Sequence, residues 1–458
     1  MSLPTVYVET YGCQMNVADT EMVLRLLEQG GYARTLDPAV ADVILINTCA
    51  VRERAVERVR GRASMLAQYK SHNKRVVLGI TGCMAEHLRG ELREQAPYVD
   101  LVVGPDSYRR LLDHIERARA GEYVQDTGLD PFETYEGLDP TRTITSGTSG
   151  TSGTSGMTGG VTGNVPIQRG CDRFCTFCVV PFTRGRERGT PPDEVVRQVR
   201  VLAENGFREV QLLGQTVNSY RFGDVSFADL LRRVAEVDGI DRIRFTSPYP
   251  LDFSADVIAA MVELPKVCKH VHLPLQSASD SVLERMRRGY SFTEYTTLVE
   301  ALRVAMPDGA ITTDLLVGFC GETDAEFEQT FRAVTDIRFD NAFTFAYSER
   351  KGTLAARKIP DDVPAEVKQR RLARVIEEQR RITAEIYAAQ VGRHERVLCE
   401  SPARRTPTQL LGRTETYRPV IVTPGQGAAV GDLLDVLIDR AGPGTLYGVP
   451  LTGASGRE

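Results

Sequence analysis

The chain has 458 residues, of which 26% are charged and 42% are hydrophobic, and its net charge is −5. At about 150 residues per domain, this length predicts roughly three domains, each able to bury its own core. No apolar run approaches the roughly 20 residues of a membrane helix, and the acidic balance excludes a strongly basic nucleic-acid binder, so any RNA contact must come from local patches.

Residues 1–140 alternate strand-like and helix-like patterns, which predicts a doubly wound, parallel sheet of the α/β class. The strand-like runs and two intervening helical patterns lie at 6–11, 20–29, 43–47, 51–68, 76–80 and 101–103. Cys13, Cys49 and Cys83 each follow the end of a predicted strand, where open parallel sheets bind ligands. Because neighbouring strands lie about 4.8 Å apart, these thiols can converge on one cluster. From the spacing alone, three unrelated buried cysteines fit equally well.

A tract rich in threonine, serine and glycine occupies residues 141–163, with Thr-Ser-Gly repeated from Thr145 to Gly156. Met157 and Val161 are its apolar residues after the repeats. Such a composition cannot offset the entropy lost on ordering, so we expect a flexible tether between two domains.

Three cysteines then form a C-x3-C-x2-C triplet at Cys171, Cys175 and Cys178. No further cysteine or histidine stands nearby, which argues against structural zinc, since such sites draw four ligands from paired motifs. The N-terminus shows no secretory signal pattern and the 9 cysteines are an odd number, so we expect reducing cytoplasm rather than a disulfide framework. A 4Fe-4S cluster on three thiolates keeps one iron open, and the triplet therefore predicts a catalytic cluster.

The triplet, with the aromatic Phe177 before its last cysteine, resembles that of the radical S-adenosylmethionine (SAM) superfamily. The resemblance implies that the open iron chelates SAM and that an electron from the reduced cluster splits SAM to give a 5′-deoxyadenosyl radical. Iron-sulfur potentials extend to roughly −700 mV, so a suitably tuned cluster is a strong enough electron donor.

Three short sequence motifs surround the N-terminal cysteines: TYGCQMN at 10–16, NTCAVRE at 47–53 and TGCMAE at 81–86. They resemble the N-terminal domain of the methylthiotransferases, radical SAM enzymes with an auxiliary 4Fe-4S cluster on three cysteines. The YGCQMN form resembles the tRNA-modifying branch that acts on isopentenylated adenosine. The ribosomal-protein branch usually shows GCPKN here, and the threonylcarbamoyladenosine branch a GCKVN type. The resemblance covers nearly the whole chain outside the tether. It assigns Cys13, Cys49 and Cys83 to the auxiliary cluster.

Residues 164–389 alternate six apolar runs with helices, and the resemblance implies a partial (β/α)6 barrel with its site at the C-terminal mouth. The predicted strands lie at 165–169, 209–213, 242–246, 271–273, 312–316 and 342–345. Polar residues after the second, fourth and fifth strands predict SAM contacts, although such residues equally cap helices or satisfy loops. The candidate SAM contacts are Phe177, Gln215, Asn218, His272, Gln276, Ser277, Asp314 and Glu322.

Two positions depart from the family pattern, which usually has proline in place of Cys320 and glycine in place of Ala278. Neither position belongs to the two cysteine sets. Cys320, like Cys268 and Cys399, is expected to be a small buried hydrophobic residue.

Residues 390–454 show short apolar runs broken by glycine, at 396–400, 420–423, 433–438 and 445–449. This pattern predicts a small β-barrel of the oligonucleotide-binding kind. The GRT motif at 412–414 and the pattern of residues 431–451 resemble a TRAM domain, an RNA-binding appendage. Arginines here and just after the cysteine triplet suit phosphate. The candidate RNA contacts are Arg184, Arg186, Arg188 and Arg413.

The resemblance implies a transferase that adds a methylthio group to carbon 2 of N6-isopentenyladenosine at tRNA position 37, next to the anticodon. Two SAM and two 4Fe-4S clusters are used: the radical removes hydrogen, and the auxiliary cluster carries sulfur that is methylated by the other SAM. No acid-base pair is predicted to be needed, and no residue other than the cluster ligands is predicted to be catalytic.

The implied partners are the tRNA anticodon stem-loop and a reductant protein of the flavodoxin or ferredoxin type, with the enzyme a monomer. Three alternatives stay open. The same chemistry can act on a ribosomal-protein aspartate or on threonylcarbamoyladenosine in tRNA. A non-catalytic iron-sulfur protein that binds RNA or senses redox state is the third.

Overall fold

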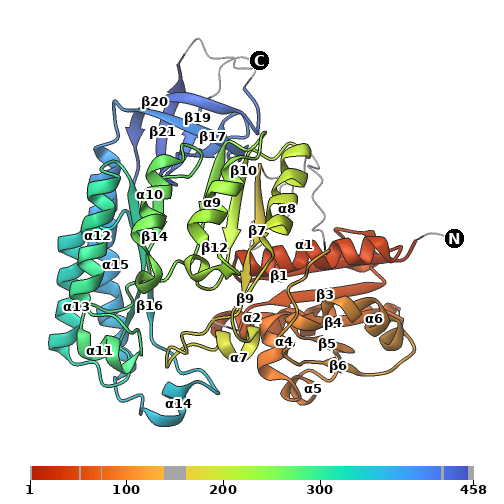
Figure 1. Ribbon diagram of the computed structural model, residues 1–458. Helices are drawn as coiled ribbons and strands as arrows, with labels where there is room; N and C mark the ends of the chain where they lie inside the picture. The colour runs from red at the N-terminus through yellow and green to blue at the C-terminus, as the bar shows by residue number, and fades with distance from the viewer. Residues whose placement is uncertain (1–2, 51–52, 74, 139–160, 424–427, 452–458) are drawn as a thin grey trace.

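The computed structural model describes residues 3–50, 53–73, 75–138, 161–423 and 428–451 (Figure 1). Within these residues the chain forms an N-terminal sheet, a larger central α/β part and a closed C-terminal barrel, in that order. The predicted tether lies outside the described residues as far as residue 160. Thr162 and Gly163, which the sequence assigned to the tether, instead begin the first strand of the central part.

The N-terminal sheet is parallel throughout, with its strands in the order β2-β1-β3-β4-β5-β6. The strands are β1 (Thr5–Tyr11), β2 (Ala33–Arg34), β3 (Val43–Thr48), β4 (Val77–Thr81), β5 (Leu101–Val103) and β6 (Val124–Asp126). The helices between them are α1 (Gln14–Gln29), η1 (Pro38–Val40), α2 (Glu53–Leu66), α3 (Tyr69–His72), α4 (Cys83–Leu88), α5 (Glu91–Gln95), η2 (Pro105–Arg110) and α6 (Leu111–Arg119).

Alternate residues of β3 enter two separate cores. Val43 and Leu45 pack with residues of α1 and α6, whereas Ile44 and Ile46 pack with residues of α2 and α4. A strand that is buried on both faces needs an unbroken apolar run, which is why β3 was evident in the sequence. The doubly wound parallel sheet is confirmed, and the sequence missed only its two short outer strands, β2 and β6.

The central part contains two parallel three-stranded sheets, β13-β10-β7 and β14-β15-β16. A parallel bridge between Ile243 and Val267 joins them, so the six strands form one curved partial barrel. The strands are β7 (Thr162–Pro166), β10 (Glu209–Leu213), β13 (Arg242–Phe245), β14 (His270–His272), β15 (Ala310–Val317) and β16 (Asn341–Ala346). The predicted six-unit partial barrel is confirmed.

Helices cover the outside of the partial barrel, and a long helix continues beyond it. The helices are α8 (Pro192–Glu204), α9 (Phe227–Ala235), α10 (Ala255–Glu263), α11 (Asp280–Arg285), α12 (Phe292–Ala305), α13 (Asp324–Ile337), α14 (Leu354–Lys358) and α15 (Ala365–Ala388). Smaller elements in the loops are β8 (Gln168–Arg169), α7 (Val180–Arg184), β9 (Arg188–Gly189), η3 (Val217–Ser219), β11 (Arg221–Phe222), β12 (Val225–Ser226) and η4 (Pro250–Asp252).

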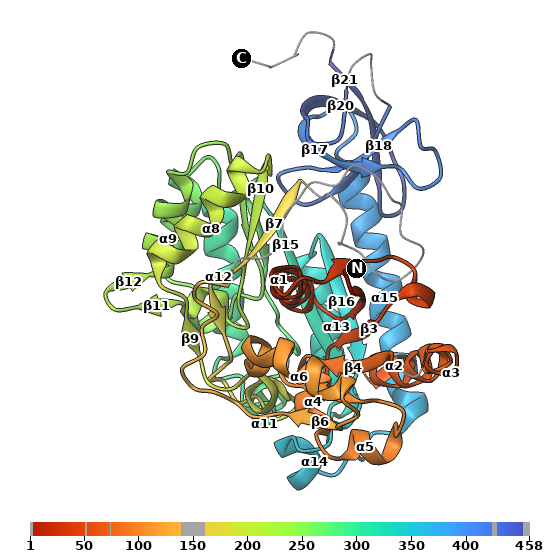
Figure 2. The same ribbon diagram turned by 90° about the vertical axis from the view of Figure 1, so that its right-hand side faces the viewer.

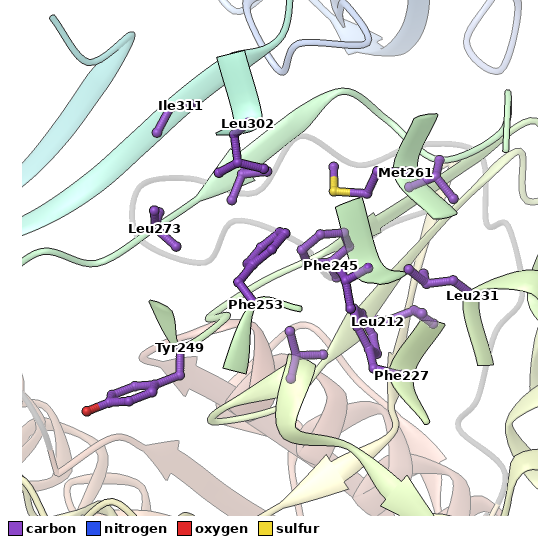
Figure 3. Close-up of a cluster of buried hydrophobic side chains, with 14 of the residues drawn as sticks. Leu212, Phe227, Leu231, Phe245, Tyr249, Phe253, Met261, Leu273, Leu302 and Ile311 are labelled. Atoms are coloured by element: carbon purple, nitrogen blue, oxygen red, sulfur yellow. The ribbon is translucent and has the colours of Figure 1, made fainter. Parts of the chain in front are cut away.

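The core of the partial barrel lies between its strands and the covering helices. Leu212 of β10, Phe245 of β13 and Phe227 of α9 are buried together there (Figure 3). Phe227 and Phe245 meet edge to face, with ring centroids 5.2 Å apart, a favourable geometry for aromatic pairs. This packing holds the carboxyl ends of the strands, and so the loops that carry the candidate residues, in a fixed arrangement.

The C-terminal strands form a closed barrel in the order β17-β18-β19-β21-β20, which confirms the predicted small β-barrel. They are β17 (His394–Pro402), β18 (Leu410–Arg413), β19 (Pro419–Val422), β20 (Leu433–Ala441) and β21 (Leu446–Pro450). Figure 2 shows α15 running from the partial barrel to this C-terminal barrel, where its residue Tyr387 joins the apolar core. None of the helices in the described ranges combines the length and apolar character that a membrane crossing requires.

Candidate metal centres

The three N-terminal cysteines follow three adjacent strands at one edge of the sheet. Cys13 precedes α1 after β1, Cys49 directly follows β3, and Cys83 opens α4 after β4. A hydrogen bond with the Cys49 thiol lowers the pKa of Cys13 to about 6, while burial raises the pKa of Cys83. The carboxyl ends of these adjacent parallel strands thus bring the three thiols to one edge of the sheet.

Two glycines let these cysteine loops approach each other. A Cβ on Gly12 would lie 2.8 Å from the Cβ of Cys49, and one on Gly82 would lie 2.3 Å from Oδ1 of Asn47. Gly82 also has a φ of +89°, which glycine adopts without the strain that a side chain brings. The close approach of the loops thus requires glycine at both positions, and the donor set of three thiols suits an iron-sulfur cluster.

A buried amide network holds two of the loops together. Asn16 Nδ2 donates to Asn47 Oδ1 at 3.1 Å, and Asn47 Nδ2 donates to Asn16 O at 2.9 Å and to Thr20 Oγ1 at 2.8 Å. The Cys13 thiol in turn donates to Asn16 Oδ1 at 3.4 Å. The sequence-based prediction did not single out Asn16 and Asn47, although both lie within the motifs around the cysteines.

The C-x3-C-x2-C triplet lies in the loop that follows β8. Cys171 and Cys175 are buried and Cys178 is partly buried. Burial raises the pKa of Cys171 to about 11 and that of Cys178 to about 12, and each of these thiols is also affected by the charge of Cys175. The proximity of the three thiols is reflected in these mutual effects.

Hydrogen bonds fix the triplet loop from its own backbone and from a buried arginine. The backbone N–H groups of Arg173 and Val180 donate to the sulfur atoms of Cys171 and Cys178, each at 3.5 Å. Arg288 Nη1 donates to Cys175 Sγ at 3.3 Å. Hydrogen bonds to cluster sulfur are one of the factors that set an iron-sulfur potential, so this loop has the surroundings that such a cluster needs.

In the part of the chain that the structure describes, no three His, Cys, Asp or Glu side chains are grouped as ligands of one metal ion. This absence is compatible with a cluster, because the thiolates of a 4Fe-4S cluster bind different irons and stand further apart than the ligands of a single ion.

Some of the candidate SAM residues lie together near the ends of β14 and β15. His272 Nε2 is 3.4 Å from Asp314 Oδ1, and the Gln276 N–H donates to the Asp314 carbonyl at 2.8 Å. Gln276 has a φ of +72°, uncommon for a residue with a side chain. Gln215, after β10, has a buried Oε1 without a hydrogen-bond partner among the described residues. These four residues carry polar groups at the mouth of the partial barrel.

Other candidate SAM residues have internal partners. Asn218 exchanges two hydrogen bonds with the backbone of Tyr249, at 2.6 and 2.9 Å. Ser277 Oγ lies 3.1 Å from Thr330 Oγ1, and the Phe177 ring packs edge-on against Phe319. Asn218 and Ser277 thus satisfy the structure around them, which is the alternative role that the sequence left open.

Glu322 combines both situations. Its Oε2 accepts hydrogen bonds from the Gly318 N–H at 2.6 Å and from Arg371 Nη1 at 2.8 Å, while Oε1 is buried without a partner among the described residues. Burial raises the pKa of Glu322, against the charge of Arg371. One oxygen therefore orders the loop after β15, and the other is available to a hydrogen-bond donor.

The arginines predicted to contact RNA occupy different environments. Arg184 and Arg188 are buried, at 3% and 9% exposure, and form ion pairs with Asp19 and Asp106. In this arrangement their guanidinium groups cannot reach RNA, contrary to the prediction, because both face the interior between the N-terminal and central parts. Arg186 is exposed and pairs with Asp172.

Arg413, the fourth predicted RNA contact, lies in the C-terminal barrel. Its guanidinium is 4.5 Å from the centroid of the Tyr417 ring and 3.4 Å from Oε1 of Glu400, with 28% of the side chain exposed. The remaining cysteines, Cys268, Cys320 and Cys399, are buried at no more than 2% exposure, as predicted for small hydrophobic residues.

Comparisons with known proteins agree with these three parts. A profile of the radical SAM superfamily matches residues 165–334, one described as uncharacterized protein family UPF0004 matches 5–104, and a TRAM domain profile matches 388–451. Together with the partial barrel and the cysteine triplet, these matches define a radical SAM protein that carries a TRAM domain. The sequence-based expectation of this class, of 4Fe-4S clusters and of SAM as cofactors is confirmed.

Relatives similar over almost the full length specify the family. A protein of Chlorobium phaeovibrioides named tRNA-2-methylthio-N(6)-dimethylallyladenosine synthase is 43% identical over 445 residues, covering 97% of this chain and 96% of the relative. A protein of the same name from Porphyromonas gingivalis is also 43% identical, over 97% of this chain and 94% of the relative. The chain belongs to the tRNA-2-methylthio-N(6)-dimethylallyladenosine synthase family.

Solved structures share the fold at low sequence identity. The radical SAM methyltransferase TsrM from Kitasatospora setae, with cobalamin and a [4Fe-4S] cluster bound, matches with a TM-score of 0.56 and 13% identity, over 78% of this chain and 77% of that one. The cobalamin-dependent radical enzyme OxsB matches with a TM-score of 0.51 and 11% identity, over 83% of this chain and 56% of that one. At these identities the likeness supports the fold alone.

Proposed function

We propose that this protein is a methylthiotransferase that adds a methylthio group to carbon 2 of N6-isopentenyladenosine at tRNA position 37. The observation that carries the proposal is the pair of three-cysteine sets in neighbouring domains, bridged by the contact between Arg184 and Cys83. Its substrate follows from the name of the relatives that are similar over nearly the full length.

We assign Cys171, Cys175 and Cys178 to the radical SAM cluster. The auxiliary cluster is assigned to Cys13, Cys49 and Cys83. When bound, the two clusters supply the electron that cleaves SAM and the sulfur that is transferred, with two SAM consumed per product. The protein contributes thiols that are largely withdrawn from solvent, since four of the six cysteines are buried.

The mouth of the partial barrel is assigned to SAM. Gln215 and Glu322 each provide a buried oxygen without a partner among the described residues, and such acceptors suit the amino and hydroxyl hydrogens of SAM. His272, Gln276 and Asp314 add polar groups at the ends of β14 and β15. Phe177 supplies an apolar wall beside Phe319.

The partner is tRNA, bound at its anticodon stem-loop with the help of the C-terminal barrel. Arg186 and Arg413 remain the arginines proposed to contact RNA, since both side chains have exposed surface. A reductant protein of the flavodoxin or ferredoxin type would provide electrons to a monomeric enzyme in the cytoplasm, where tRNA is modified.

The test uses the full chain, reconstituted anaerobically with iron and sulfide and supplied with SAM, dithionite and tRNA that contains N6-isopentenyladenosine. Mass spectrometry of the digested nucleosides is expected to show the 2-methylthio derivative. Cys399→Ala, in the C-terminal barrel, serves as the matched control and should keep full activity, whereas Cys175→Ala should lose it.

Two other substrates are run in parallel, a ribosomal-protein peptide that contains the target aspartate and a tRNA that carries threonylcarbamoyladenosine. Methylthiolation of either one, with no product on isopentenylated tRNA, would overturn the proposed substrate. If a protein with its full iron content forms no 5′-deoxyadenosine, the proposed enzymatic function is overturned. A non-catalytic iron-sulfur protein is then favoured.

A further inference from the structure

Helix α7 connects the two cysteine sets directly. At its beginning, the Val180 N–H donates to Cys178 Sγ at 3.5 Å, and at its end Arg184 Nε donates to Cys83 Sγ at 3.1 Å. The residue before the helix, Val179, packs with Ala50 and Cys83. Figure 1 shows α7 next to α4, the helix that Cys83 opens. A helix of five residues thus separates a thiol of one set from a thiol of the other.

A single carboxylate of the N-terminal part anchors both sides of the triplet loop. Asp19, on α1, is fully buried and accepts from Arg184 Nη2 at 2.6 Å and from Arg169 Nη1 at 3.1 Å. Arg169 stands two residues before Cys171, and its guanidinium stacks 3.5 Å from the centroid of the Tyr135 ring. We call Asp19, Arg169 and Arg184 the interdomain clamp. Because α1 follows Cys13, the clamp ties the triplet loop to the auxiliary loops.

The charges of the clamp are unequal. Two guanidinium groups face one carboxylate, and the neighbouring Arg188 has its own partner in Asp106. Burying a cation is costly unless an anion compensates it. Arg184 Nη1 is also buried without a hydrogen-bond partner among the described residues. The anion in reach of this surplus cation is the thiolate that Cys83 would supply as a cluster ligand, and Arg184 Nε already contacts the sulfur of Cys83.

We propose that Arg184 is a positioning residue that raises the reduction potential of the auxiliary cluster and, through Asp19, fixes the spacing between the two clusters. The inference rests on the proposed assignment of Cys83 as a cluster ligand. Reduction adds one electron to the cluster and increases its negative charge. A buried cation and a hydrogen bond to ligand sulfur stabilise the reduced state, and both are known determinants of cluster potential.

The charge argument predicts shifts of opposite sign for the two ends of one ion pair. Arg184→Gln removes the cation and should lower the equilibrium constant for reduction of the auxiliary cluster about tenfold. For a one-electron couple this is a drop of about 59 mV in the midpoint potential. Asp19→Asn removes the neighbouring anion and should shift the potential upward. Loosening of the domain interface would move both variants in the same direction.

The midpoint potential is measured by EPR on the full chain with a Cys171→Ala, Cys175→Ala and Cys178→Ala background, so that the auxiliary cluster alone contributes. Arg184→Lys keeps the charge and should retain most of the wild-type potential. Arg117→Gln, which changes an exposed arginine that pairs with Glu122 in the N-terminal domain, is the control and should leave the potential unchanged.

Shifts of the same sign in Arg184→Gln and Asp19→Asn, or no shift in either at intact iron content, would overturn the proposal. If Arg184→Gln fails to hold iron, Arg184→Lys and Asp19→Asn decide it, because a wild-type potential in Asp19→Asn contradicts the charge argument. An auxiliary cluster that persists in Cys83→Ala would refute the ligand assignment and the inference together. Predicted potential shifts in a protein that modifies no tRNA would overturn only the substrate.

Discussion

Arg244 of β13 connects the partial barrel to the C-terminal barrel, and its removal should weaken the contact between them. Its Nε donates to Glu209 Oε2 at 2.8 Å, while its Nη atoms donate to the carbonyl oxygens of Thr414 at 2.7 Å and Glu415 at 2.8 Å. The Arg244 and Glu209 side chains are each only 2% exposed. In Arg244→Met, Glu209 stays buried without its cation and both carbonyls lose a donor.

Breaking a buried ion pair by removing one partner costs about 3–5 kcal/mol, so Arg244→Met should lower the free energy of unfolding by about 4 kcal/mol. Urea unfolding followed by circular dichroism measures this loss, and limited proteolysis shows whether the C-terminal barrel is released. Arg232→Met is the matched control, because its pair with Asp256 at 2.7 Å is 35% and 54% exposed and should cost at most about 1 kcal/mol.

A double variant tests the cause of the loss. If the uncompensated carboxylate dominates, Arg244→Met combined with Glu209→Gln should recover a large part of the lost stability, because a neutral amide then replaces the buried carboxylate. A loss below about 1 kcal/mol in Arg244→Met, or a double variant that is less stable than the sum of the single ones, would refute this reasoning.

Two further predictions concern the cysteine sets and acid stability. Cys171→Ala should abolish SAM cleavage, whereas Cys13→Ala should still release 5′-deoxyadenosine but give no methylthiolated nucleoside; equal loss of cleavage in both would contradict the division of roles. Although partial burial raises the pKa of Glu326, hydrogen bonds from Arg285 and Ser281 lower it to about 2. The stabilisation from ionised Glu326 is therefore complete above the unfolded pKa of about 4.3 and is lost as the pH falls through about 2. In the apoprotein, the difference in Tm between wild type and Glu326→Gln should be constant above pH 5 and shrink on acidification; a constant difference down to pH 2 would argue against this linkage.

The elements that the sequence predicted best are those with unbroken apolar runs. Strands β3 and β4 are buried along their whole length, so their apolar composition marks them. The short outer strands β2 and β6 carry only two and three residues and no apolar pattern, and they were missed. Strand β7 reads Thr-Gly-Asn-Val-Pro, and its register comes from pairing with β10 rather than from its own residues. The sequence therefore placed the strand three residues too late.

The candidate site shows the same division between local and long-range information. The cysteines were found because their spacing and their flanking sequence motifs are local signals. The carboxylate of Asp19 and the guanidinium of Arg169 meet across 150 residues of chain, and no local pattern connects them. Arg288 lies 113 residues from Cys175, to which it donates. Only the folded arrangement of the domains reveals these partners.

The arginines after the triplet illustrate why local basicity misled the prediction. In sequence, Arg184, Arg186 and Arg188 form one basic motif, and phosphate is the expected partner of such a motif. In the structure, the short turn of α7 and β9 sends the outer two inward to Asp19 and Asp106, and leaves Arg186 outside with Asp172. Two buried carboxylates of the N-terminal domain thus pair with arginines of the central domain, and Asp19 also pairs with Arg169. This basic motif is therefore part of the contact between the two domains. The relative positions of the two cysteine sets depend on that contact.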